Sequence, residues 1–291
     1  MRLCTSTNIL FERPEGQRVP VEESIRRCVK AGYKYLDFCF VDQVFTPFPT
    51  PFTTSAWEPY MRNILEEAGE LGVTFLQAHL PLHDFCAKKQ DYAYELDLMQ
   101  RALIACSWAK IPYAVAHPMT HVVDGKMAPD TLEKNVLYFR DLAKFAANLG
   151  VGLALENMWR EAACGVKRFT SKKDDILALV KAIDRENVGI CLDTVHGSAE
   201  GFDQAQAIRE FGSYLKALHV SDEDGHGNFH ILPYEGRCDW SGILQALHDI
   251  GYDHGFTYEL QHYTWRAPEC EIDALLRKSY ELGVKMAGEQ R

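Results

Sequence analysis

Short apolar runs alternate with longer amphipathic segments along the chain. The apolar runs are four to seven residues long and often rich in β-branched or aromatic side chains. Nearly continuous apolar runs of this length are typical of parallel strands that are buried on both faces. We expect strands at Leu3–Ile9, Tyr35–Phe40, Thr74–His79, Tyr113–His117, Gly152–Glu156, Val188–Leu192, Ala217–Val220 and Thr257–Leu260.

An amphipathic segment with helical periodicity follows each apolar run. We expect helices at Val21–Lys30, Trp57–Leu71, Tyr92–Ala109, Thr131–Asn148, Lys172–Ala182, Asp203–Phe211, Trp240–Asp249 and Glu269–Lys285. Glycines support this division, because a residue that accepts a left-handed backbone often ends a helix. Gly32, Gly72, Gly150 and Gly251 each lie between an expected helix and the next expected strand.

Eight strand–helix units without a serine- or proline-rich linker predict an α/β fold, a closed (β/α)8 TIM barrel. We expect residues 1–291 to form this barrel as one domain. A doubly wound open sheet is the alternative. That fold would favour a glycine-rich turn after the first strand, and Thr5-Ser6-Thr7-Asn8 is not such a turn.

Composition narrows the range of partners. The chain has 31 basic and 41 acidic residues and a formal net charge of −10, which opposes a large nucleic-acid interface or an anionic membrane surface. Its nine cysteines include no CxxC pair, which favours reduced thiols in the cytoplasm. We see no signal peptide and no apolar run of the length that a membrane-spanning helix needs.

Polar residues end several of the apolar runs. An imidazole or carboxylate at the end of a buried strand is unfavourable unless it is paired or coordinated, and these strand ends converge at one mouth of a barrel. Two further histidines lie just beyond strand ends, at His196 and His230. The residues at the ends themselves are His79, His117, Glu156, Asp193, His219 and Glu259.

Four of these residues come from the last four expected strands and form a candidate metal site. Glu156, Asp193, His219 and Glu259 supply three carboxylates and one imidazole. This donor set suits one divalent ion: Mn²⁺, Mg²⁺, Co²⁺ or Zn²⁺. The carboxylates favour the harder ions and the additional histidines are compatible with zinc, so we prefer Mn²⁺ or Zn²⁺.

The same strand ends resemble a known family. Leu155-Glu156-Asn157, Leu192-Asp193-Thr194-Val195-His196, His219-Val220-Ser221-Asp222 and Tyr258-Glu259 are similar to motifs of the xylose-isomerase-like barrel superfamily. Residues 224–240 resemble that family's loop after strand seven, and the resemblance is most specific over residues 152–260. The superfamily contains sugar and sugar-phosphate isomerases and epimerases, inosose dehydratases and an apurinic endonuclease branch.

The resemblance implies one metal ion at the four residues named above and substrate contact by His196. The endonuclease branch holds more metals, with residues that match His79, His117, His196 and His230. This sequence has Asn228 where many relatives have aspartate. An amide is a poorer metal ligand than a carboxylate, which argues against a complete multinuclear site.

We therefore expect a metal-dependent isomerase or epimerase of a sugar or sugar phosphate. The metal would stabilise an enediolate while Glu156 and Glu259 remove and return a proton on opposite faces of the substrate. His196 would bind a substrate oxygen or move a hydroxyl proton, and Arg237 would meet an anionic group. The expected substrate contacts are His79, His117, His196, His230, Arg237 and Trp159, with Trp240, Phe45 and Tyr234 as further candidates for the wall.

Other functions remain open at this point. A dehydratase-like lyase acting on an inosose would use the same ligands, and an endonuclease-like phosphodiesterase would use the additional histidines but is opposed by the net charge. A non-enzymatic binding module is the fourth alternative. The loop Phe45–Ser55, rich in proline and aromatics, is a lid, a contact in a homodimer or homotetramer, or a plain surface loop. Asp222–Asp239 is a second long loop at the same face.

Overall fold

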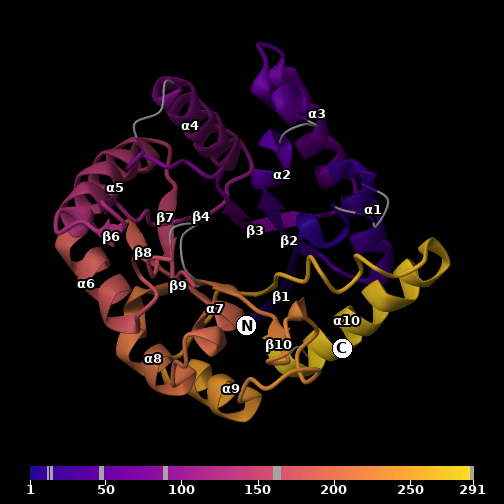
Figure 1. Ribbon diagram of the computed structural model, residues 1–291. Coiled ribbons are helices and arrows are strands. Elements are labelled where there is room, and N and C mark those ends of the chain that lie inside the picture. Colours follow the sequence, from indigo (N-terminus) through magenta and orange to yellow (C-terminus); the bar gives the residue numbers. More distant parts are fainter. Residues whose placement is uncertain (12, 14–15, 46–48, 88–90, 160–164, 289–291) are drawn as a thin grey trace.

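Eight parallel strands form the centre of the fold in the computed structural model, which describes residues 1–11, 13, 16–45, 49–87, 91–159 and 165–288 (Figure 1). The strands are hydrogen-bonded in the order β12-β1-β2-β3-β4-β7-β8-β9. Their bounds are β1 (Arg2–Ser6), β2 (Tyr35–Cys39), β3 (Thr74–His79), β4 (Tyr113–Ala116), β7 (Gly152–Glu156), β8 (Val188–Asp193), β9 (Leu215–His219) and β12 (Gly255–Tyr258).

The two ends of this sheet meet just beyond β9. Val220 and Tyr258 form a parallel bridge. The Val220 amide donates to the Thr257 carbonyl (2.7 Å), and the Glu259 amide donates to the Val220 carbonyl (3.1 Å). These bonds join the last strands in the order and close the ring, so the expected (β/α)8 barrel is confirmed.

Helices surround the ring of strands on the outside (Figure 1). Their apolar faces pack against the outward-facing side chains of the strands and form the main core. The long helices are α1 (Val21–Ala31), α3 (Trp57–Glu70), α4 (Tyr92–Trp108), α5 (Thr131–Asn148), α6 (Lys173–Ile183), α8 (Gln204–Phe211), α9 (Trp240–Asp249) and α10 (Ile272–Ala287).

A second, small core lies inside the barrel. Val115, Ala154, Cys191 and Ala217 are fully buried and form their own apolar cluster, with Tyr113 packed against it. Except for Lys216, their neighbours along the strands belong to the main core, because successive side chains of a strand point to opposite faces. The position two residues after each of these four therefore also faces the barrel axis, one layer nearer the C-terminal mouth.

The expected elements differ from the observed ones mainly at their ends. The first strand stops at Ser6 because its hydroxyl accepts from the Asn8 amide (3.4 Å) and begins a 3-10 helix at Thr7–Leu10. The strands expected at Ala217–Val220 and Thr257–Leu260 lie about two residues earlier, as β9 and β12. Gly32, Gly72, Gly150 and Gly251 all have positive φ, as their position after a helix requires.

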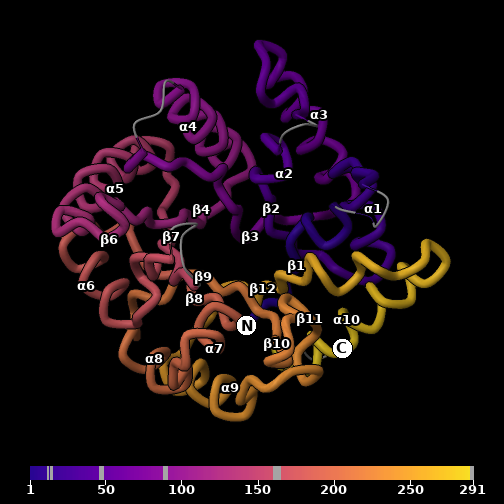
Figure 2. Tube along the Cα trace, in the orientation of Figure 1, coloured from indigo at the N-terminus to yellow at the C-terminus, as the bar shows by residue number. Residues whose placement is uncertain are grey.

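Several short elements at the mouth are absent from the expectations. They include α2 (Val41–Val44), α7 (Thr194–Ala199) and the hairpin of β10 (Asp222–Glu223) and β11 (Phe229–Ile231), which lies next to α7 (Figure 2). A smaller hairpin pairs β5 (Val122–Val123) with β6 (Lys126–Met127). Part of the Phe45–Ser55 loop and Cys164 lie outside the described residues, within which eight cysteines are free thiols.

Within the described part of the chain, no helix is both long enough and apolar enough to cross a lipid bilayer.

Candidate metal centre at the mouth of the barrel

The strand periodicity brings the four expected metal ligands together. Glu156, Asp193 and His219 stand two residues after Ala154, Cys191 and Ala217, so they extend the inner core towards the mouth. One ligand atom of each of the three, together with one of Glu259, lies within 4.8 Å of the others. The four side chains are thus close enough to share one ion.

His219 lies between the two glutamates. Its Nδ1 atom is 3.0 Å from Glu156 Oε1 and 3.5 Å from Glu259 Oε2. The imidazole is fully buried, as is Asp193. One oxygen of Asp193, Oδ2, is buried and accepts no hydrogen bond. A buried carboxylate oxygen without a donor is unfavourable, and a cation bound by the cluster would satisfy it. The residues therefore suit a divalent metal.

The electrostatics of the cluster also favour a cation. Burial raises the pKa of Asp193 well above its usual value, and the neighbouring Glu156 and Glu259 carboxylates raise it further. Burial acts in the same direction on Glu156, but His219 and His117 outweigh it and hold the pKa of this carboxyl well below its usual value. The two glutamates are thus held ionised beside the imidazoles, and Asp193 is the carboxyl that burial and these two neighbours hold protonated, so a divalent cation would favour its ionised form.

Asn157 holds part of the site in place. Its side chain is fully buried, accepts from the Asp193 amide (2.8 Å) and donates to the Asp193 carbonyl (3.1 Å). Its main-chain oxygen is 2.8 Å from His196 Nδ1. If Nδ1 donates in this contact, the Nε2 atom of the neutral ring is left as an acceptor. Burial lowers the pKa of His196 to about 3, so the ring stays neutral.

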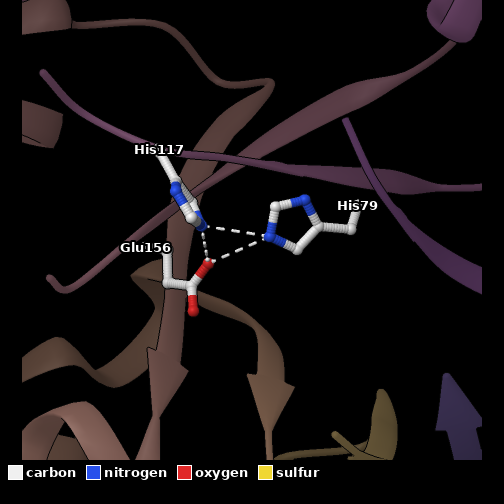
Figure 3. A group of neighbouring side chains, drawn as sticks. All are labelled: His79, His117 and Glu156. Atoms are coloured by element: carbon white, nitrogen blue, oxygen red, sulfur yellow. Dashed lines mark hydrogen bonds and ion pairs between the residues drawn. The ribbon is translucent and has the colours of Figure 1, made fainter. Parts of the chain in front are cut away.

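His79, His117 and Glu156 form a second group that shares one glutamate with the first (Figure 3). The two Nε2 atoms lie 3.0 Å apart. Glu156 Oε2 is 2.9 Å from His117 Nε2 and 3.5 Å from His79 Nε2. Glu156 therefore directs one oxygen towards His219 and the other towards this histidine pair.

A cavity of about 530 Å³ opens above the four-residue cluster. Glu156 and Glu259 line it, whereas Asp193 and His219 are fully buried and are not part of its wall. Trp159 forms one side, with its ring stacked on His196 at a centroid distance of 5.4 Å. The other expected contacts that line the cavity are His79, His117, His196 and His230.

Other expected residues lie elsewhere. Arg237 forms an ion pair with the buried Glu223 and lines a separate cavity beside α8. Trp240 is buried and donates its Nε1–H to Asp222 (2.7 Å), so it belongs to the support of the Asp222–Asp239 loop. Asn228 is exposed and bonded to Asp224. Phe45 and Tyr234 are not among the residues that line the cavity.

The cavity also contains residues that the sequence reasoning missed. Asn8 Nδ2 lies 3.5 Å from Glu259 Oε1. Asn8 lies just beyond the end of β1, in the 3-10 helix Thr7–Leu10, which places it at the mouth of the barrel. Asp42, in the short helix α2, and Arg168, in a loop, gave no signal in the sequence because neither residue ends an expected strand. The remaining wall residues are Cys39, Val41, Leu82, Met158, Phe229, Gln261 and His262.

Fold and site together define a (β/α)8 barrel with a buried histidine–carboxylate cluster, suited to a divalent metal, at its C-terminal mouth. A family model described as xylose isomerase-like TIM barrel matches residues 25–282. The chain belongs to this family.

Similar proteins with assigned activities include isomerases and epimerases. An inosose isomerase of Bacillus velezensis is 22% identical over 279 residues, which is 92% of each chain. A D-psicose 3-epimerase of Ruminiclostridium cellulolyticum is 35% identical over 127 residues. That match covers 44% of this chain and 40% of the epimerase, and a match to an uncharacterised Methanocaldococcus jannaschii protein covers 42% of that protein.

Solved structures support the same fold. A D-psicose 3-epimerase crystallised in the presence of D-fructose has a TM-score of 0.77 and 19% identity, covering 99% of this chain and 100% of that one. The IOLI protein, whose structure contains a zinc atom, has a TM-score of 0.76 and 18% identity, covering 99% of each chain.

Proposed function

We propose that this protein is a divalent-metal-dependent isomerase or epimerase of a ketose, acting by proton transfer at the carbon next to the carbonyl. One observation carries the proposal: of the four clustered ligands, Glu156 and Glu259 line the cavity, while Asp193 and His219 lie buried below it. Of the four clustered residues, the two that a substrate can reach are thus the two glutamates, whose carboxyl groups can exchange protons with it. The sugar epimerases and isomerases among the relatives support this reaction class.

Glu156, Asp193, His219 and Glu259 would hold the metal. A divalent ion at this position would polarise a substrate carbonyl and favour loss of the neighbouring proton. We prefer Mn²⁺ or Zn²⁺ for this donor set, and the zinc atom in the IOLI protein is consistent with the second.

Glu156 and Glu259 would act as the acid–base pair. Glu156 at the end of β7 and Glu259 just after β12 each direct one carboxylate oxygen to His219 Nδ1, at 3.0 and 3.5 Å. Burial raises the pKa of Glu259, but His219 and His230 outweigh burial and lower it to about 2. Both carboxyl groups are therefore ionised before reaction and ready to accept a proton. For epimerisation, one removes the proton from one face and the other returns it on the opposite face.

Two further residues would bind the sugar. The neutral His196 ring, anchored through Nδ1 to the Asn157 carbonyl, offers Nε2 to a substrate hydroxyl. Trp159, stacked on His196 and 4.4 Å from the Phe229 ring, provides a flat apolar surface for the C–H face of the sugar. These contacts would fix the reacting carbon between the two glutamates.

The test is exchange of the proton next to the carbonyl, followed by NMR in D₂O. Protein loaded with Mn²⁺, Co²⁺ or Zn²⁺ is incubated with ketoses, ketose phosphates and inososes. Glu156→Gln and Glu259→Gln should each lower exchange by about 10²–10⁴-fold, the usual contribution of a positioned acid or base. Glu210→Gln, on the outer helix α8, is the matched control. Retention of most activity by either cavity variant would refute the two-base scheme.

An endonuclease-like phosphodiesterase is the second candidate, because His79, His117 and Glu156 form a further ligand group beside the first. Asn228 opposes it, since this residue is exposed and bonded to Asp224. Cleavage of a duplex that contains an abasic site, without proton exchange on any ketose, would favour this function. Loss of water from an inosose would favour the dehydratase-like lyase.

A further inference from the structure

Arg168 differs from the other arginines whose side chains the structure describes. Each of the others has a hydrogen bond, an ion pair or a ring contact. Within the described residues, the Arg168 guanidinium has no such partner, although the chain has ten more acidic than basic residues. It lines the cavity above the metal cluster and is the one lysine or arginine among the described residues that does so.

Hydrogen bonds hold the main chain at Arg168 and in the residues that follow it, and one of them reaches Glu156. The Arg168 carbonyl accepts from the Ser171 amide (3.1 Å), and the next residue, Phe169, donates its amide to the Thr120 hydroxyl (2.7 Å). The Thr170 hydroxyl donates to the Glu156 carbonyl (3.3 Å). These bonds hold the base of the Arg168 side chain at a defined place relative to Glu156, so its reach into the cavity is limited.

The charges near Arg168 leave it available for a ligand. The adjacent Lys167 is engaged with Glu200 at 2.6 Å and does not line the cavity. Asp42, on the cavity wall, is kept mainly protonated at neutral pH because burial raises its pKa to about 8. Among the described residues, the other carboxylates of the wall are Glu156 and Glu259, which belong to the proposed metal site.

The two glutamates and Arg168 lie at different depths of the cavity. Glu156 is 1% exposed and Glu259 is 7% exposed at the floor, whereas Arg168 is exposed at the rim. The cavity of about 530 Å³ has room for a substrate that extends from one to the other. A guanidinium pairs with phosphate or carboxylate through two parallel hydrogen bonds, so it favours an anionic oxygen group over a hydroxyl.

We propose that the substrate carries an anionic oxygen group, a phosphate or a carboxylate, at the end remote from its carbonyl, and that Arg168 at the cavity rim binds this group. This inference rests on the proposed function for the identity of the reacting carbonyl. It assigns to Arg168 the anion contact that the sequence suggested for Arg237.

A binding experiment tests the inference without requiring turnover. Metal-loaded protein is titrated calorimetrically with D-glucitol and D-glucitol 6-phosphate, two acyclic polyols that lack a carbonyl. The phosphate should bind at least about tenfold more tightly to the wild type, the effect of one charge-assisted contact. Arg168→Gln should remove this difference, and Arg168→Lys should retain part of it. Lys167→Gln, which removes the same charge from the neighbouring residue, should preserve it.

The outcome decides between clear alternatives. Equal binding of the two polyols to the wild type, or an unchanged preference in Arg168→Gln, would overturn the inference. Equal losses in Arg168→Gln and Lys167→Gln would also overturn it, because they would indicate a general charge effect.

Proton exchange on D-fructose, D-fructose 6-phosphate and D-fructuronate then distinguishes the anion and tests the proposed function separately. For the preferred anionic ketose, Arg168→Gln should raise KM about tenfold or more and leave kcat nearly unchanged. The same variant should leave the KM of D-fructose unchanged. A phosphate preference in binding without exchange on any ketose would refute the isomerase while supporting the Arg168 contact. Proton exchange on all three sugars with equal KM values would support the isomerase and refute the Arg168 contact.

Discussion

Replacing Asp193 with asparagine should stabilise the metal-free protein while removing its stabilisation by metal. Asp193 Oδ1 accepts the His196 amide (2.7 Å), and an asparagine oxygen can keep this bond. Asp193 Oδ2 accepts no hydrogen bond and shares the cluster with Glu156 and Glu259. An amide NH₂ in its place would remove one buried acid and offer a donor to the neighbouring carboxylates.

The expected rise in Tm follows from the burial of the Asp193 carboxyl group. Replacing buried ionic groups with neutral ones of similar volume is often neutral or stabilising, by up to about 4 kcal/mol. For 291 residues, about 2.1 cal/mol/K of unfolding entropy per residue makes 1 kcal/mol equal to about 1.6 °C in Tm. The metal-free Asp193→Asn protein should therefore melt about 2–6 °C above the metal-free wild type.

The gain in Tm of Asp193→Asn over the wild type should increase with pH. The pKa of Asp193 is raised in the folded state by burial and by Glu156 and Glu259. A carboxyl with a raised folded pKa stabilises the fold below its unfolded pKa, and this contribution is lost as pH rises towards the folded value. Asparagine does not titrate. The difference in Tm between variant and wild type should thus be small near pH 4 and increase towards pH 8.

Asp222→Asn is the matched control. Asp222 is also fully buried, but its oxygens accept from the amides of Glu223, Tyr234 and Cys238 and from the Trp240 indole. In Asp222→Asn, the side-chain NH₂ group would face main-chain amide or indole donors and could not accept hydrogen bonds from them. Loss of two such bonds, at about 1–3 kcal/mol each, should lower Tm by about 3–10 °C.

Both variants are measured by thermal unfolding after chelation and again with excess Mn²⁺ or Zn²⁺. At a metal concentration of 100 times Kd, the wild type should gain about 2.7 kcal/mol, or about 4 °C, and Asp193→Asn should gain little. A metal-free Asp193→Asn protein that melts below the wild type at pH 8, or a difference that shrinks with rising pH, would refute the electrostatic reasoning.

Two further predictions follow from the site. Purified protein that is reconstituted with metal and desalted should contain about one divalent ion per chain by elemental analysis, bound at the four-residue cluster. Two or three zinc ions per chain would instead favour the endonuclease-like site that includes His79 and His117. Asn157→Ala should weaken metal binding about 10–100-fold in competition with a fluorescent chelator, because Asn157 holds the Asp193 main chain through two bonds; an unchanged affinity would contradict its positioning role.

The barrel itself could be predicted from sequence because its signals are local and repeated. Each strand is a short apolar run and each of four helix ends has a glycine whose positive φ is observed. The ends of elements were less accurate where tertiary contacts decide them. The Ser6 hydroxyl bond to Asn8 ends β1 early, and no apolar pattern contains that information. The β10–β11 hairpin was missed for a similar reason, because its two strands are only two and three residues long.

The clustering of Glu156, Asp193, His219 and Glu259 could be predicted because the alternation of side chains along a strand tells which sequence positions face inward. A polar residue two positions beyond an inward-facing apolar residue must also point inward, and the mouth of the barrel collects these ends. This is how Ala154 leads to Glu156, Cys191 to Asp193 and Ala217 to His219. Asn8 was missed because it lies beyond the end of its strand, in a 3-10 helix where this periodicity no longer applies.

The two arginines mark the limit of sequence reasoning at this site. Arg237 was chosen because it lies in a loop that resembles a family motif, yet its guanidinium pairs with Glu223, a carboxylate that is 1% exposed. Arg168 lies in no motif and has no described partner, yet it lines the cavity. The two arginines differ in whether a carboxylate pairs with the guanidinium, and this depends on how distant segments pack. Substrate charge should therefore be inferred from the unpaired arginine at Arg168 and not from the one whose charge Glu223 already neutralises.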